Sequence, residues 1–320
     1  MTKTAFLFPG QGSQSVGMLS VAHDAWPIVI DTFSEASEVL GFDLWQMAKE
    51  GSAETQALTA NTQPLVLTAS AALFRAYRGA GGTMPAVVAG HSLGEFSALV
   101  AADCLSFTDA VSLVRLRGEA MQASVPTGVG AMAAIIGLDD ESINITCARV
   151  SRGDDYQVLA VNYNSPGQVV IAGHTEAVTE AMDLLKQVGA KRALPLPVSA
   201  PFHTPLMGYA GEVLGEALSD TQLNDPVIPV VSNVTATLHY SAADIKALLV
   251  RQVSAPVQWT GCIATMVAWG CENFVECGPG KVLSGLLKRI DRSLPCSVME
   301  TPEDLELVLR TVANEGIYAQ

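Results

Sequence analysis

Apolar runs of strand length alternate with stretches of helical periodicity along most of the chain. Outside the middle of the chain, the expected elements are strands at residues 5–8, 86–89, 227–231 and 274–277 and helices at residues 109–123 and 283–289. Strands that alternate with helices are typical of an α/β fold with a mostly parallel sheet. We therefore predict this fold for the larger part of the chain.

Residues 128–198 follow a different order of elements. The expected elements are a strand at 130–138, a helix at 139–150, strands at 157–164 and 168–173, a helix at 175–189 and a strand at 192–198. One apolar face of the second helix holds Val178, Ala181, Met182, Leu185 and Val188. The order β-α-β-β-α-β is that of a ferredoxin-like unit. We predict a ferredoxin-like small subdomain at 128–198, inserted into a large α/β subdomain formed by residues 1–127 and 199–320.

Composition and charge narrow the classes of function. Apolar residues make up 49% of the 320 residues and charged residues 16%, which allows a large core. The longest nearly apolar run, residues 64–74, is too short to cross a bilayer, and the N-terminal residues indicate a first strand rather than a signal peptide. A net charge of −14 argues against nucleic-acid binding, so any anionic ligand needs a local positive site. Six scattered cysteines indicate neither a disulfide framework nor a zinc site and favour a reducing cytoplasm.

The segment Gly90-His91-Ser92-Leu93-Gly94 lies between a predicted strand and a predicted helix. A serine between two glycines in this position is the pattern of a nucleophile elbow, in which the hydroxyl stands clear of a tight turn. The helix that follows can help to stabilise an oxyanion. An ordinary strand-to-helix loop would show the same residue types, but the flanking elements favour Ser92 as a nucleophile.

A serine nucleophile needs a base, and the chain offers five histidines. His91 adjoins the serine and is interpreted as a packing residue, His174 as a helix cap, and His23 and His239 as surface residues. By elimination His203, in a proline-bracketed loop at residues 197–205, is the best base. No acidic residue stands out as a third member, and more than a hundred residues follow His203, unlike the usual α/β-hydrolase order. A plain hydrolase triad is therefore in doubt.

Two arginines on the predicted helix 109–123 differ in their neighbours. Arg115 is four residues before Glu119, as in a solvent-side ion pair. Arg117 lies on the apolar stripe, three residues after Val114 and four before Met121. A guanidinium group on a core face must be paired or must bind an anion. Both a buried arginine–carboxylate pair and a site for an acyl group that ends in a carboxylate fit this position.

Several motifs occur along the chain in a recognisable order. They are Phe8-Pro9-Gly10-Gln11-Gly12-Ser13-Gln14, Thr62-Gln63-Pro64, Gly90-His91-Ser92-Leu93-Gly94-Glu95, Arg115-Leu116-Arg117-Gly118, Asn162–Gly173 and Pro197–His203. Together they resemble the malonyl-CoA:acyl carrier protein transacylase family of bacterial fatty acid synthesis over essentially the whole chain. The resemblance implies an α/β-hydrolase-like core with a ferredoxin-like insert. It also implies a cytoplasmic, monomeric enzyme that passes a malonyl group from malonyl-CoA to acyl carrier protein without a metal or a tightly held cofactor.

The resemblance also implies roles for individual residues. By motif, Ser92 is acylated, His203 is its base, and the carbonyl of Gln252 orients the histidine. The backbone N–H groups of Gln11 and Leu93 form the oxyanion hole, and Arg117 binds the malonyl carboxylate. Gln63 and Asn162 line the cleft, and Phe202 favours malonyl over methylmalonyl groups. A backbone carbonyl in the place of an acid accounts for the missing third carboxylate.

Three other functions stay open at this stage: a serine thioesterase, a non-catalytic carrier-docking subunit and a trans-acting polyketide acyltransferase. The missing acid and Arg117 argue against the first, and the presence of both Ser92 and His203 argues against the second. The third would use the same chemistry with a different carrier. Candidates for docking an acidic carrier are Lys191, Arg192, Lys281, Lys288, Arg289 and Arg292, although a solvated helix face also explains residues 288–292.

Overall fold

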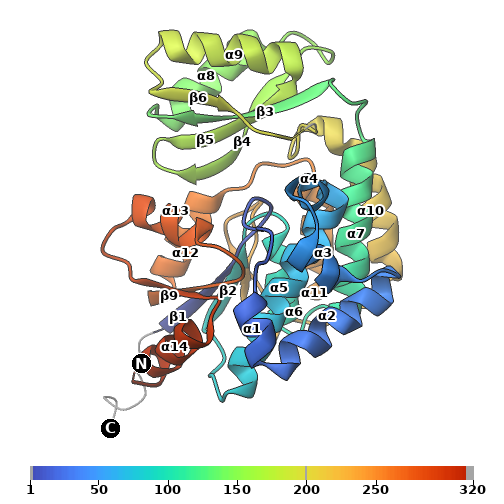
Figure 1. Cartoon of the computed structure of the whole chain (residues 1–320). Coiled ribbons are helices and arrows are strands. Elements are labelled where there is room, and N and C mark those ends of the chain that lie inside the picture. Colours follow the sequence, from blue (N-terminus) through green and yellow to red (C-terminus); the bar gives the residue numbers. More distant parts are fainter. Residues whose placement is uncertain (1–2, 199, 315–320) are drawn as a thin grey trace.

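The computed structural model describes residues 3–198 and 200–314, and these form two separate sheets (Figure 1). The larger sheet has the strand order β10-β9-β1-β2-β7-β8. Its strands are β1 (Lys3–Phe8), β2 (Val87–Gly90), β7 (Val230–Val231), β8 (Leu238–His239), β9 (Cys271–Cys277) and β10 (Cys296–Met299). Neighbouring strands are parallel except β7 and β8, which are antiparallel. The predicted α/β fold with a mostly parallel sheet is confirmed.

Helices cover both faces of the larger sheet. Phe6 and Phe8 of β1 pack on the face covered by α5 and α6, whereas Ala5 and Leu7 pack on the face covered by α12 and α13. Both faces are buried, which is why the strands are apolar at nearly every position. The helices of this subdomain are α1 (Ser20–Ala25), α2 (Pro27–Leu40), α3 (Leu44–Glu50), α4 (Ala53–Ala57), α5 (Thr59–Gly79), α6 (Gly94–Ala101), α7 (Phe107–Ala123), the 3₁₀ turn Pro205–Met207, α10 (Gly208–Asp220), α11 (Ala242–Gln252), α12 (Trp259–Ala268), α13 (Val282–Ile290) and α14 (Pro302–Asn314).

The smaller sheet is antiparallel throughout and has the strand order β4-β5-β3-β6. It is formed by β3 (Gly130–Ile136), β4 (Val158–Ser165), β5 (Gln168–His174) and β6 (Arg192–Pro195), with α8 (Asp140–Val150) and α9 (Thr175–Gln187) packed on one face. This is the predicted β-α-β-β-α-β order. The limits at residues 128 and 198 stay a prediction, and Ser199, the first residue of the predicted return segment, lies outside the described residues.

Three sequence expectations are wrong in detail. The last strand of the small subdomain, expected at 192–198, ends at Pro195. The strand expected at 227–231 is reduced to β7, which begins only after Pro229, because proline has no N–H to donate to the sheet. Val188, expected on the buried face of the second small-subdomain helix, is 52% exposed. The reason is that α9 ends at Gln187, so Val188 no longer follows the helical repeat.

Backbone hydrogen bonds join the two subdomains along β4. The N–H of Tyr163 donates to the carbonyl of Val257 (3.0 Å), and the N–H of Val257 donates to the carbonyl of Val161 (2.8 Å). Asn162 lies between these bonds and is thereby held at the boundary between the subdomains. Within the described part of the chain, none of the helices combines the length and apolar character that crossing a bilayer requires.

Candidate active site

Ser92 lies on the turn between β2 and α6, at the carboxyl edge of the larger sheet. Its φ angle of 53° falls in the left-handed region, which is strained for a residue with a side chain. The flanking glycines are required by close approach of the backbone. A Cβ on Gly90 would lie 1.8 Å from the carbonyl carbon of Gly94, and a Cβ on Gly94 would lie 2.0 Å from the carbonyl oxygen of Phe8. The turn therefore has the compact geometry of a nucleophile elbow.

His203 reaches Ser92 from the loop that leaves the small subdomain. Its Nε2 lies 2.8 Å from Ser92 Oγ, and its Nδ1 lies 2.8 Å from the carbonyl oxygen of Gln252. Because a carbonyl can only accept, Nδ1 carries the proton and Nε2 is left to accept from the serine hydroxyl. The φ angle of His203 is 63°, so both partners have strained backbones. The arrangement is that of a nucleophile and its base, with a backbone carbonyl in the third position.

Gln11 and Leu93 lie beside Ser92 and line the same cavity. Gln11 follows β1, and Leu93 directly precedes α6. In the chain as described, neither backbone N–H donates to a protein acceptor, so both are available to an external oxygen. Two N–H donors next to a nucleophile can stabilise the charge that develops on a carbonyl oxygen under attack. Their assignment as an oxyanion hole stays a prediction.

Helix α7 presents its two arginines to different surroundings. It begins two residues before the predicted start, because Ser106 Oγ accepts from the N–H of Asp109 (3.1 Å) and caps the helix. Arg115 is partly exposed and pairs with Glu119 at 2.6 Å, as expected. Arg117 is only 1% exposed.

The guanidinium group of Arg117 is held by amide oxygens. Nη1 donates to Gln63 Oε1 (2.9 Å), and Nη2 donates to Gln252 Oε1 (2.9 Å) and to Ser92 Oγ (3.2 Å). Among the described residues no carboxylate lies within ion-pair distance of Arg117, and its Nε has no hydrogen-bond partner. Of the two alternatives that the sequence left open, the buried arginine–carboxylate pair is therefore wrong.

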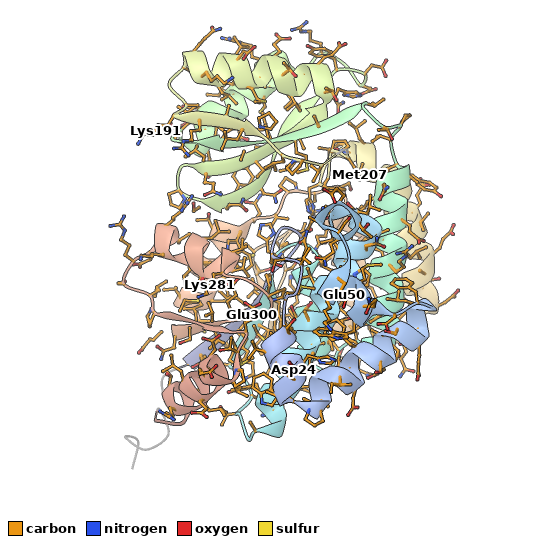
Figure 2. All side chains as sticks on the ribbon, in the orientation of Figure 1. Asp24, Glu50, Lys191, Met207, Lys281 and Glu300 are labelled. Carbon is orange, nitrogen blue, oxygen red and sulfur yellow. The ribbon has the colours of Figure 1, made fainter. Side chains whose placement is uncertain are left out.

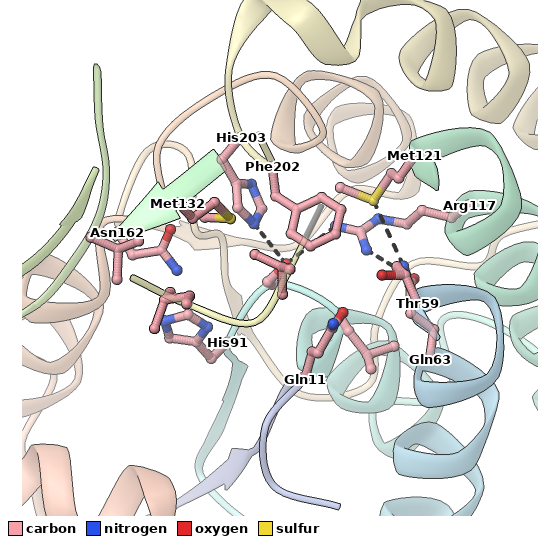
Figure 3. A pocket seen from close by; sticks show the side chains of 15 residues that line it. Gln11, Thr59, Gln63, His91, Arg117, Met121, Met132, Asn162, Phe202 and His203 are labelled. Atoms are coloured by element: carbon pink, nitrogen blue, oxygen red, sulfur yellow. Dashed lines mark hydrogen bonds between the residues drawn. The ribbon is translucent and has the colours of Figure 1, made fainter. Parts of the chain in front are cut away.

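Ser92, His203 and Arg117 face one cavity between the subdomains, shown in Figure 3. The ring of Phe202 lies between His203 and Arg117 in this view, and Asn162 lies on the far side of His203. The cavity measures about 130 Å³. Engineered protein cavities of about 150 Å³ hold one benzene molecule, so this one suits an acyl group of about six non-hydrogen atoms rather than a long chain.

Burial controls the protonation of the site. Burial, and after it the positive charge of Arg117, lower the pKa of His203 to about 3. The imidazole is therefore neutral near pH 7, as a base must be before it accepts a proton. Burial also lowers the pKa of Arg117 to about 10, which leaves the guanidinium group charged at neutral pH.

Two buried polar residues beneath the turn were missed by the sequence analysis as site residues. Asn233 Oδ1 accepts from the N–H of Ser92 (2.6 Å), and its Nδ2 donates to the carbonyl of Gly90 (2.7 Å), so one side chain clamps both arms of the turn. Glu95 Oε2 accepts from the N–H of Asn233 (3.1 Å) and from Gln252 Nε2 (2.7 Å). The sequence could have indicated Glu95, since it is the only charged residue in the apolar segment 93–102. No local sequence feature points to Asn233, which lies 141 residues after Ser92.

Two other histidines near the sheets have structural contacts. His91 Nε2 lies 2.8 Å from Asn164 Oδ1, which agrees with a packing role. His174 was expected to cap a helix, and this is wrong. It occupies the position before α9, but its side chain makes no capping bond there, and its Nδ1 accepts from the N–H of Gln157 (3.0 Å).

Known proteins resemble this chain over nearly its full length. Residues 5–301 match the family described as acyl transferase domain. The malonyl CoA-acyl carrier protein transacylase of Escherichia coli (strain K12) is 52% identical over 309 residues, which cover 97% of this chain and 99% of that protein. An acyl carrier protein S-malonyltransferase from Vibrio cholerae, known by its crystal structure, is 49% identical with a TM-score of 0.93, covering 96% and 100%. A malonyl-transacylase solved in complex with a type II PKS acyl-carrier protein is 47% identical with a TM-score of 0.95, covering 97% and 100%.

Proposed function

This chain belongs to the acyl transferase domain family, and we propose that it transfers the malonyl group of malonyl-CoA to the phosphopantetheine thiol of acyl carrier protein in fatty acid biosynthesis. The observation that carries the proposal is the position of Arg117, whose Nη2 lies 3.2 Å from Ser92 Oγ. A buried cation beside the nucleophile favours an acyl group that ends in a carboxylate. The small cavity favours a short one.

In the first step, Ser92 attacks the thioester carbonyl of malonyl-CoA while its proton passes to His203 Nε2. The N–H groups of Gln11 and Leu93 stabilise the oxyanion of the tetrahedral intermediate. The carbon–sulfur bond then breaks, His203 returns the proton to the departing thiolate, and CoA leaves. A malonyl ester remains on Ser92, with its carboxylate bound by Arg117.

In the second step, the carrier thiol gives its proton to His203 and attacks the malonyl ester. The ester bond to Ser92 breaks, and the serine oxygen recovers the proton from His203. The malonyl group is now a thioester of the carrier. This chemistry uses no metal and no tightly bound cofactor.

Substrate binding also acts on the base. The charge of Arg117 is one of the causes that lower the pKa of His203. A malonyl carboxylate bound to Arg117 offsets that charge, so the pKa of His203 rises when the proper substrate is present. Acetyl-CoA has no distal carboxylate and lacks this effect.

One experiment separates the proposal from its rivals. The protein is incubated with radiolabelled malonyl-CoA, with and without acyl carrier protein, and the label is followed on both proteins. A transferase retains one malonyl group on Ser92 until the carrier takes it. Rapid release of free malonate identifies a thioesterase, and the absence of any adduct identifies a docking subunit.

A polyketide carrier is the second candidate partner, because a similar malonyl-transacylase was solved with a type II PKS acyl-carrier protein. Rates measured with a fatty acid carrier and a polyketide carrier decide between the two. The monomeric state and the cytoplasmic location stay predictions, and sedimentation and cell fractionation check them.

We further propose a docking surface for the carrier on basic residues of both subdomains. Arg289 of α13 donates a hydrogen bond to Gln168 Oε1 at the start of β5. Gln168 pairs in register with Ile136 of β3, which pairs with Arg192 of β6. Strands lie about 4.8 Å apart, so Arg192 and Gln168 are about 10 Å apart across the sheet. Two clusters that are distant in the sequence therefore meet at one end of the small sheet.

Lys191 and Lys288 extend this basic surface, and both are exposed. Figure 2 shows Lys191 on the small subdomain and Lys281, just before α13, on the same side of the molecule. Because the chain has a net charge of −14, it repels an acidic carrier as a whole, and such a local basic surface attracts it.

Charge reversal tests the docking surface. Arg289→Glu and Lys191→Glu should each raise the KM for the carrier about fivefold or more while leaving the KM for malonyl-CoA unchanged, and the effect should shrink at high salt. Arg310→Glu on α14 is the matched control, because Arg310 is exposed and its ion pair is with Glu306. An unchanged KM for the carrier in both variants would dismiss this surface.

A further inference from the structure

Glu95 is a buried carboxyl group directly beneath the reaction site. It lies in the first turn of α6, three residues after Ser92, and is only 2% exposed. In the described part of the chain it has no ion-pair partner. Burying a carboxyl group without a paired cation is costly, so its presence here calls for a specific role.

Glu95 contacts the site through the side chain of Gln252. The Gln252 Nε2 donates to Glu95 Oε2 (2.7 Å) and to the carbonyl of Ser92 (3.0 Å). On its other side, Gln252 Oε1 accepts from Arg117 Nη2 (2.9 Å). The backbone carbonyl of the same residue accepts from His203. Gln252 thus contacts the nucleophile, the base and the cation.

The amide of Gln252 has two unlike ends, so its orientation matters. If it turned over, its NH₂ group would face the guanidinium group of Arg117, donor against donor, and its oxygen would face the carbonyl of Ser92, acceptor against acceptor. Glu95 supplies an acceptor oxygen on the far side of the amide. That oxygen favours the orientation in which Gln252 Oε1 faces Arg117.

We propose that Glu95 is a positioning residue that fixes the orientation of the Gln252 amide and, through it, the guanidinium group of Arg117 that receives the acyl carboxylate. The proposal rests on the proposed function, because it takes the carboxylate-binding role of Arg117 from there. It assigns to Glu95 a part in substrate selection without contact with the substrate.

Two simpler roles make different predictions. Glu95 could act only as a remote negative charge for Arg117, or only as a support for the turn through Asn233. The charge role is weakened by the protonation of the group, since burial raises the pKa of Glu95 to about 7. A carboxyl group that is about half protonated at neutral pH still offers an acceptor oxygen but not a full charge.

Glu95→Gln and Glu95→Ala separate these roles. Gln keeps one acceptor oxygen for Gln252 and Asn233 without a charge, and its NH₂ group can point toward the Ser232 hydroxyl, which contacts the carboxyl group of Glu95. Ala removes the acceptor. If Glu95→Ala does not fold, Glu95→Leu fills the same space without an acceptor.

The measurement is kcat/KM for acylation of Ser92 by malonyl-CoA and by acetyl-CoA. Removing the acceptor should lower the malonyl-to-acetyl ratio about tenfold or more, and Glu95→Gln should leave the ratio within about threefold of the parent. If Glu95→Ala lowers kcat/KM equally for both thioesters, Glu95 only supports the turn that carries Ser92. An equal fall of the malonyl-to-acetyl ratio in Glu95→Gln and Glu95→Ala would show that Glu95 acts only as a remote negative charge. Either result overturns the proposal.

A double mutant tests whether Glu95 acts through Gln252. Gln252→Met removes the amide but keeps the backbone carbonyl that holds His203. If the proposal is correct, Glu95→Ala added to Gln252→Met lowers the ratio no further. Additive losses would overturn the proposal.

Glu276→Gln is the matched control for removing a buried carboxylate. Glu276 is fully buried in β9, but its oxygens accept from the N–H groups of Leu283 and Ser284 at the start of α13. The control should leave the malonyl-to-acetyl ratio unchanged. A parent protein that forms no malonyl adduct refutes the proposed function. If the parent prefers malonyl-CoA over acetyl-CoA and Glu95→Ala leaves the malonyl-to-acetyl ratio unchanged, only the role of Glu95 is overturned.

Discussion

The two walls of the cavity differ in chemistry and in construction. The polar wall, formed by Gln63, Ser92, Arg117 and His203, comes from helices α5 and α7, the turn after β2 and the loop that leaves the small subdomain. The apolar wall, formed by Met132, Val170, Leu196, Val198 and Phe202, comes from the small subdomain and the loop that leaves it. Hydrogen bonds between distant segments hold the polar wall in place. The apolar wall continues the face of the small sheet that α8 and α9 leave uncovered.

This difference separates two tasks. In the proposed mechanism, the polar wall supplies the nucleophile, the proton transfers and the charge that a carboxylate needs, so changes there should alter rates by orders of magnitude. The apolar wall offers only shape, so changes there should alter the preference among acyl groups by smaller factors. Substitutions in each wall test this division.

The largest effect is expected at Ser92. Ser92→Ala should remove the malonyl adduct and lower transfer by at least about 10⁴-fold, because the attacking oxygen is lost. Intact-protein mass spectrometry after incubation with malonyl-CoA measures the adduct. Ser97→Ala on α6, the helix that follows Ser92, is the control, since Ser97 Oγ is buried and has no hydrogen-bond partner among the described residues. A malonyl adduct on a cysteine in the parent would contradict the mechanism.

Arg117→Ala should cost about 2–5 kcal/mol in malonyl transfer, roughly 30-fold to several thousandfold, because the substrate carboxylate is left without its partner. Acylation by acetyl-CoA should be largely spared. The measurement is kcat/KM for both thioesters, with Arg115→Ala as the control on the exposed side of α7. If both rates fall together, Arg117 supports the structure of the polar wall rather than selecting the substrate.

The polar wall should also affect stability in a pH-dependent way at Glu95. Burial raises its pKa from 4.5 to about 7, so the folded state binds this proton more tightly than the unfolded state does. The resulting stability is fully present below pH 4.5 and is lost as the pH rises through about 7. Glu95→Gln lacks this loss. The free energy of unfolding of the parent should therefore fall relative to the variant across this range, by on the order of 3 kcal/mol.

Chemical denaturation at a series of pH values measures that difference. His203 and the other titratable groups occur in both proteins, so the difference between the two curves isolates Glu95. A difference that does not vary between pH 4.5 and 7 would show that the carboxyl group titrates normally despite its burial.

The smallest effect is expected on the apolar wall. The ring of Phe202 lines the cavity next to the base and should restrict the space around the α-carbon of the acyl group. We expect the parent to prefer malonyl-CoA over methylmalonyl-CoA. Phe202→Ser should reduce that preference by about 1–3 kcal/mol, which is the usual value of a methyl group in a pocket.

The ratio of kcat/KM for the two thioesters measures this preference. Val198→Ala, also on the apolar wall, serves as a milder comparison. If the parent uses both thioesters within a few-fold, or if Phe202→Ser leaves the ratio unchanged, then Phe202 only packs the loop and the apolar wall does not select by size.

Local patterns were sufficient for most of the elements that were predicted and for the turn that carries Ser92. The strand, the glycine-flanked Ser92 and the helix after it follow from backbone geometry over a dozen residues, and these residues carry the same constraints in any surroundings. The order of elements in the small subdomain also follows from local patterns of apolar and polar residues. Errors occurred where a single residue ended a pattern, as at Pro229 and at Val188.

The residue patterns alone indicated a candidate serine nucleophile, a histidine and an arginine on an apolar helix face, in an α/β chain with an inserted subdomain. Which of these groups meet became clear only from the folded chain. It places His203 2.8 Å from Ser92 across 111 residues, it holds Arg117 by amides rather than by an acid, and it joins Glu95 to Arg117 through Gln252. The physical reason is that a hydrogen bond or a buried charge depends on distances set by the packing of remote segments, and no local pattern of residues encodes those distances.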